Sequence, residues 1–183
     1  ELAPLLELLN TGCQNDGNLL QLAEHKTLLP AVVAALSGAT GAAAAAAARL
    51  LYTLSTVEEG RKAVSRAVGK EDALRSVLAL LAKSDVQLQA LTLLLLSNCM
   101  VDEGCKAAMA KVLSASAAAK DSSQDKPAQP VSPLVCLQQL VQSSSPVVSE
   151  RALTMLGNMC GHTGLRASLQ AAPALLSAVV EAL

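Results

Sequence analysis

The sequence predicts an all-α fold built from repeated units, on two observations: the choice of apolar residues and the recurrence of similar helical segments. Of the 183 residues, 52% are hydrophobic, with one Tyr and no Phe or Trp, so Leu, Ala and Val dominate the apolar set. Leu and Ala are strong helix formers, and the residues typical of strands are scarce apart from Val and Thr. The chain is long enough for one domain with a buried core, and too apolar for a disordered segment.

The first recurring segment begins at a glycine that we expect in a loop, and the clear copies carry a basic residue two positions later. These copies occupy 57–68, 101–112 and 162–172, and a weaker one starts near residue 15. The glycines, separated by 43, 44 and 60 residues, are Gly17, Gly60, Gly104 and Gly164. This spacing favours a repeat over the alternative, an irregular bundle of Leu/Ala helices.

Two further helical segments complete each unit. The second helix is predicted at 28–36, 74–82, 134–142 and 175–183. The third is predicted at 41–55, 86–99 and 146–160, with 2–12 as the tail of an earlier copy. We therefore expect a single repeat domain over 1–183: a partial repeat at 1–27, repeats at about 28–73, 74–133 and 134–174, and a partial repeat at 175–183. Because the chain starts at Glu1 and stops as a second helix completes, we expect it to be a piece of a longer one.

The ends of the third helices carry a resemblance to the armadillo repeat family. In that family this helix ends in an apolar residue, a variable residue and Asn, and a basic residue follows early in the next first helix. The matching tripeptides are Leu8-Leu9-Asn10, Leu96-Ser97-Asn98 and Leu156-Gly157-Asn158, with Lys106 and Arg166 after the last two. The resemblance covers nearly the whole chain and implies a right-handed α-α superhelix whose third helices line a concave face.

The resemblance also implies which residues contact a partner. In armadillo proteins the Asn side chains bond the backbone of an extended peptide, because an amide offers both a donor and an acceptor. Asn10, Asn98 and Asn158 are therefore candidate peptide contacts, and Thr53, which replaces Asn in one copy, is a weaker candidate. The alternative is that each Asn caps or bonds the end of its own helix.

One turn before this Asn line, the nuclear-import adaptors of the family carry Trp. This sequence has other residues there: Leu6, Arg49, Leu94 and Thr154. The missing Trp residues argue against an import adaptor. Arg49, and Arg151 a further turn back in the last unit, favour a partner segment that carries carboxylates. The alternative is that these arginines are solvated or paired with a nearby carboxylate: Glu58, Glu59 or Glu150.

The repeat is interrupted by a segment at 114–133 that we expect to be a flexible insertion. It is rich in Ser, Ala, Asp, Lys, Gln and Pro, and the distance from the glycine to the second helix grows to 30 residues, against 11 to 14 elsewhere. Such a composition buries too little apolar surface to order itself. It has either no role or a docking role regulated by phosphorylation at Ser122 or Ser123.

Several classes of function are disfavoured. The net charge is −1 and the basic residues are not interleaved with aromatics, so we expect no nucleic acid partner. The Ala-rich stretch 31–48 is interrupted by Ser, Thr and Gly, which makes a poor membrane span. His25 and His162 fall in different repeats without nearby ligands at metal spacing, so we expect no metal, cofactor, small-molecule substrate or catalytic dyad. For His162 we expect a solvent-facing or capping role.

We therefore expect a non-enzymatic scaffold or adaptor that binds another protein along its third helices. Family members serve in transport, adhesion, chaperoning and cytoskeletal assembly, and the missing Trp residues favour cytoskeletal, axonemal or chaperone-linked assembly. The alternative is a rigid spacer within a larger multidomain protein. Five cysteines without paired spacing indicate a reducing compartment. We therefore expect the protein in the cytoplasm, in association with the cytoskeleton or a cilium, or in the nucleus. The partner and the oligomeric state are left open.

Overall fold

The computed structural model describes residues 2–36, 38, 41–118 and 132–183. These residues form twelve α-helices and contain no β-strand. The prediction of an all-α fold is confirmed.

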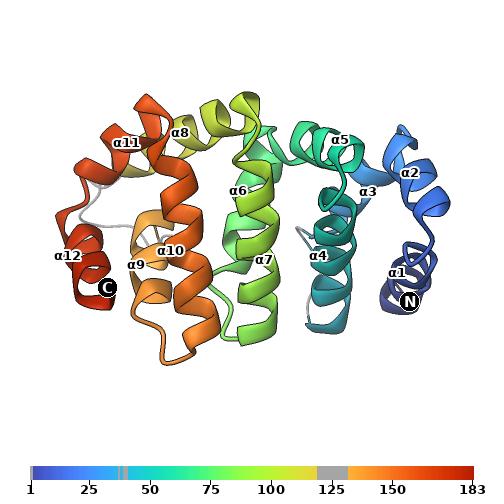
Figure 1. Cartoon of the computed structure of the whole chain (residues 1–183), viewed down its shortest axis with the longest axis horizontal. Helices are drawn as coiled ribbons and strands as arrows, with labels where there is room; N and C mark the ends of the chain where they lie inside the picture. The colour runs from blue at the N-terminus through green and yellow to red at the C-terminus, as the bar shows by residue number, and fades with distance from the viewer. Residues whose placement is uncertain (1, 37, 39–40, 119–131) are drawn as a thin grey trace.

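The third helices of the predicted units form a row. They are α1 (Leu2–Gly12), α4 (Gly41–Ser55), α7 (Val86–Cys99) and α10 (Pro146–Cys160), with the bounds that the sequence predicts. Each packs on the next, and Figure 1 shows them side by side with the two termini at opposite ends of the row. Ala46, Ala47 and Ala48 of α4 are fully buried, and these small side chains allow the neighbouring helices to approach closely.

The first helices lie across one end of this row, at the top of Figure 1. They are α2 (Asp16–Glu24), α5 (Glu58–Val68), α8 (Glu103–Ala118) and α11 (Thr163–Gln170), and they also pack in succession. The repeat glycines are in the first turns of these helices, so the prediction that they lie in loops is wrong.

Three of the first helices, α2, α8 and α11, begin before their glycines with a side-chain cap from the preceding residue, whereas Val57 before α5 makes no side-chain cap bond. The side chains of Asn15 and Asp102 accept hydrogen bonds from backbone N–H groups of α2 and α8. His162 Nδ1 accepts one from the N–H of Leu165, at 3.3 Å, so the predicted capping role of this histidine is confirmed. A cap satisfies a donor that has no partner within its own helix.

The second helices are α3 (Leu28–Leu36), α6 (Glu71–Leu80), α9 (Pro133–Val141) and α12 (Pro173–Ala182). All but α3 begin one to three residues earlier than predicted. Proline occupies the first position of α9 and α12, where its missing N–H costs nothing. Glu71 and Asp72 lie in the first turn of α6, where carboxylates interact favourably with the helix dipole.

Part of the predicted flexible insertion is helical. Residues 114–118 continue α8, so the expectation that flexibility begins at Ser114 is wrong. The segment contains Ala, the best helix former, and Ser116 Oγ donates to the Val112 carbonyl at 2.8 Å. Residues 119–131, which include Ser122 and Ser123, lie outside the described residues.

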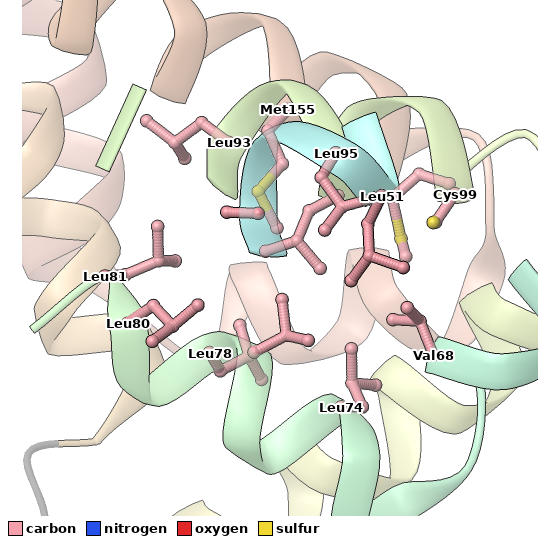
Figure 2. Packing of buried hydrophobic residues seen from close by; sticks show 14 of the residues in the cluster. Leu51, Val68, Leu74, Leu78, Leu80, Leu81, Leu93, Leu95, Cys99 and Met155 are labelled. Atoms are coloured by element: carbon pink, nitrogen blue, oxygen red, sulfur yellow. The ribbon is translucent and has the colours of Figure 1, made fainter. Parts of the chain in front are cut away.

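The core lies where the third helices pack against the second helices and against the first helices at the end of the row. Figure 2 shows Leu51 of α4, Leu93 and Leu95 of α7, and Leu74 of α6 converging there, and all four are fully buried. The two central third helices, α4 and α7, each pack against two neighbouring third helices and against first and second helices. Within the described ranges no single helix is long and apolar enough to cross a bilayer. Only α2 and α3 taken together reach that length and composition, and they are bent by 81° at the break between them.

Candidate functional site

A groove of about 330 Å³ lies between the adjacent third helices α7 and α10. Its lining residues are Leu94 and Ser97 of α7, and Val147, Glu150, Arg151 and Thr154 of α10. Three of these, Leu94, Arg151 and Thr154, are candidates from the sequence. The fold therefore brings predicted residues from two repeats together at one place.

Local interactions at the helix starts position the two walls of the groove. Asp85 caps α7 by accepting from the N–H of Leu88 at 3.0 Å. Pro146 opens α10, and Ser149 Oγ donates to the carbonyl of Val141 at the end of α9, at 2.7 Å. These contacts fix where each helix starts, and the buried side chains Leu93 and Met155 fix which face turns inward.

The groove combines apolar walls with a few polar groups. Leu94 is half-buried and Val147 is 48% exposed, so both offer carbon surface to a ligand. Thr154 is exposed, and its Oγ1 donates to the carbonyl of Glu150 in its own helix at 2.9 Å, so the hydroxyl oxygen keeps its capacity to accept a hydrogen bond. Arg151 is half-buried and forms no ion pair with any described residue. Such a lining suits one apolar side chain with polar or acidic neighbours.

The Asn line connects neighbouring third helices. Asn98 Nδ2 of α7 donates to Ser55 Oγ of α4 at 2.9 Å, and Asn158 Nδ2 of α10 donates to the Ser97 carbonyl of α7 at 3.4 Å. Asn10 Nδ2 of α1 donates to the Ala46 carbonyl of α4 at 3.0 Å. Each of these bonds joins two different helices. The alternative prediction, that each Asn side chain caps or bonds the end of its own helix, is therefore wrong for these three side-chain bonds.

The three asparagines differ in what remains accessible. Asn10 is 7% exposed, and its Oδ1 is buried without a hydrogen-bond partner among the described residues. Asn98 is half-buried and Asn158 is exposed. Only the latter two can therefore turn a carbonyl oxygen toward a partner while their amide N–H groups hold the neighbouring helix.

The other two candidates lie on α4, away from the groove. Arg49 Nη1 contacts Glu7 Oε1 of α1 at 3.3 Å, with both side chains about half exposed. This pairing matches the alternative of an ion-paired arginine, although the partner is Glu7 and not Glu58, Glu59 or Glu150. Thr53 is half-buried. In the α1–α4 half of the row, Asn10 and Arg49 are thus engaged by bonds between the two helices.

Three residues of the groove were not among the sequence candidates: Ser97, Val147 and Glu150. A signal for two of them exists. Val147 and Glu150 precede Thr154 by seven and four positions, and residues at these spacings share one face of a helix. Ser97 carries no such signal, because its place in the groove depends on the packing of α7 against α10.

The described residues contain no group of three or more His, Cys, Asp or Glu side chains that could hold a metal ion. Four cysteines, Cys13, Cys99, Cys105 and Cys136, are buried, while Cys160 at the end of α10 is exposed. The pKa of the Cys105 thiol is strongly raised by its contact with the Cys99 thiol and by burial, and burial also raises the pKa values of Cys13 and Cys136. These thiols are poor nucleophiles in the folded chain.

No protein-family model matches the chain, and no curated protein matches it.

Proposed function

We propose that this chain is a non-enzymatic protein-binding module of the armadillo type, in which the row of third helices is the concave face of a right-handed superhelix. The module holds an extended segment of a partner protein against α7 and α10. The observation that carries this proposal is the convergence of Leu94, Arg151 and Thr154 on one groove. Their positions relative to the Asn line predict them from the sequence, and Leu94 lies 57 and 60 positions before Arg151 and Thr154 along the chain.

In this proposal the groove takes one apolar side chain of the partner between Leu94 and Val147. Arg151, which has no ion pair among the described residues, receives a carboxylate from an adjacent partner residue. The side-chain amide oxygens of Asn98 and Asn158, whose Nδ2 groups bond to the neighbouring helices, accept backbone N–H groups of the same segment. The partner therefore has an extended segment with an apolar residue beside an acidic one.

The sharpest test blocks the groove without breaking the bonds between the helices. Thr154→Arg places a long side chain over the groove, because Thr154 is exposed and bonds only to its own helix. Thr163→Arg is the matched control, since Thr163 is an exposed threonine on α11 outside the groove lining. Proteins captured by the unmodified chain should be retained by Thr163→Arg and lost with Thr154→Arg. Equal capture by the two variants would contradict the groove model.

The second candidate function is that of a rigid spacer in a larger protein. It is favoured by the α1–α4 half, where Arg49 is engaged by Glu7 and the alanines of α4 are buried against neighbours. A spacer acts through its stiffness and needs no partner on this face. In that case the isolated chain should capture no partner protein, whether it is unmodified or carries Thr154→Arg or Thr163→Arg.

A further inference from the structure

A second pocket, of about 590 Å³, lies on the side of the chain formed by α2, α3 and α5. One wall is the link between α2 and α3 together with the start of α3. The other wall is one face of α5 together with the residue that precedes α6: Glu59, Lys62, Ala63, Arg66 and Ala67 of α5, and Lys70. None of its lining residues belongs to the groove between α7 and α10, so the pocket is a separate site.

The pocket has an apolar floor and a mainly basic rim. Ala23 and Leu29 are buried at 5% and 3% exposure, and Ala63 and Ala67 are half-buried. Four cations lie around this floor, Lys26, Lys62, Arg66 and Lys70, against two lining carboxylates, Glu24 and Glu59. All four cations are exposed. The lining therefore attracts anions while offering carbon surface for an apolar side chain.

Three of these cations form no ion pair within the described part of the chain. Lys62 forms an ion pair with Glu58 of its own helix at 2.7 Å. Lys26, Arg66 and Lys70 form no ion pair with any described residue; Arg66 Nε donates only to the Lys62 carbonyl, at 3.2 Å. They lie on opposite walls: Lys26 on the α2–α3 link, Arg66 on α5 and Lys70 on the link between α5 and α6.

The repeat itself does not require these charges. Counted from the glycine of each first helix, the positions of Arg66 and Lys70 are occupied in α8 by Ala110 and Ser114. In α11 the position of Arg66 is taken by Gln170. The charges of Arg66 and Lys70 are therefore particular to this unit and are not shared by the corresponding positions of α8.

From this charge complementarity and the apolar floor, we propose that the pocket between the α2–α3 link and α5 binds an acidic peptide segment of a partner protein. An apolar side chain of that segment packs on Leu29, Ala63 and Ala67, and flanking carboxylates contact Lys26, Arg66 and Lys70. The site is independent of the groove between α7 and α10. A peptide is favoured over a nucleic acid because the pocket has no aromatic side chain for base stacking, and over a lipid surface because it is concave and carries carboxylates on its rim.

The test uses the acetylated peptide Glu-Glu-Leu-Glu-Glu and its counterpart with Gln at every Glu. Titration of the isotope-labelled chain, followed by amide NMR shifts, should perturb residues 23–30 and 59–70 with the acidic peptide only. Arg66→Ala/Lys70→Ala should weaken binding by about threefold to thirtyfold, as expected for the loss of two exposed ion pairs. Arg75→Ala/Lys83→Ala removes two exposed charges outside the pocket lining and should leave the affinity unchanged.

The proposal is overturned if the acidic peptide causes no shifts at millimolar concentration, or if both double variants weaken it equally. It is also overturned if the shifts centre on 94–98 and 147–158, which would place the peptide in the groove. Two parallel titrations use a uridine oligonucleotide and vesicles of phosphatidylcholine with phosphatidylserine. Tighter binding of either probe than of the peptide would assign the pocket to another class of ligand.

Discussion

Replacing Gly60 by alanine should destabilise the chain, although alanine is the better helix former. Gly60 lies in the first turn of α5, close to the end of α4. A Cβ added there would overlap the carbonyl oxygen of Leu54, lie 2.9 Å from its carbonyl carbon and lie 3.1 Å from Cγ2 of Val57. The first obstacle is backbone, so no rotation of a flexible side chain can relieve it.

The size of the effect follows from two opposing contributions. Relief of the overlap requires α5 to move away from α4, where Leu54 and Val64 are fully buried, and overpacking of this kind costs about 1–3 kcal/mol. The backbone clash places Gly60 at the upper end of that range. Alanine regains about 1 kcal/mol of helix propensity. The net loss should be about 2 kcal/mol, or about 4–8 °C in melting temperature for a chain of this length.

Gly157→Ala is the matched control. Gly157 is an exposed position within α10, and a Cβ there would meet no described atom within 4 Å beyond the local backbone of its own helix. This variant should gain about 0.5–1 kcal/mol, because only the backbone preference changes. The assay is urea unfolding followed by far-ultraviolet circular dichroism. Effects of the same sign for the two variants, or a Gly60→Ala variant as stable as the parent, would refute the close approach of α5 to α4.

Three other outcomes are expected. Ser65→Ala should leave the free energy of unfolding unchanged or raise it by up to about 1 kcal/mol, because Ser65 Oγ is buried without a partner among the described residues. A loss of more than about 1 kcal/mol in thermal unfolding would contradict this and would mean that the hydroxyl forms a hydrogen bond. Asn98→Ala should lower the free energy of unfolding by about 0.5–1.5 kcal/mol, because it removes the bond from α7 to Ser55 of α4. A double-mutant cycle with Ser55→Ala should give a coupling energy of about 0.5–1 kcal/mol. Additive effects of the two substitutions would mean that this bond does not contribute to stability. Under native conditions Cys160 should react with iodoacetamide before the other cysteines, as followed by mass spectrometry, because it is the exposed one. Early labelling of the four buried thiols would contradict the packing; these are Cys13, Cys99, Cys105 and Cys136.

The helices could be predicted from the sequence because their signals are local. The Leu/Ala periodicity of 41–55, 86–99 and 146–160 gives the bounds of α4, α7 and α10 directly. Errors arose at the starts of helices. Glycine is typical of loops, so the sequence favours a loop at these positions. Their actual role, as small residues in a crowded first turn, depends on contacts between helices such as the one between Gly60 and Leu54, which the sequence does not show.

The site was predictable in part for the same reason. Leu94, Arg151 and Thr154 were found from their spacing to the Asn line. The hydrogen-bond partners of the Asn line could not be predicted, because the Asn98–Ser55 and Asn158–Ser97 bonds join positions that are 43 and 61 residues apart. The Glu7–Arg49 pair and the basic pocket beside α5 likewise depend on which helices become neighbours.

The central claim is that the face formed by α7 and α10 holds a partner segment, and site-specific photo-crosslinking tests it most directly. A photoreactive phenylalanine analogue is placed at Thr154, in the groove, or at Thr163, on α11 outside the groove lining; both residues are exposed. The groove model predicts a covalent adduct with one partner from Thr154, traced by mass spectrometry to an apolar residue beside an acidic one, and none from Thr163. Adducts from Thr163 alone, or equal adducts from both positions, would contradict it.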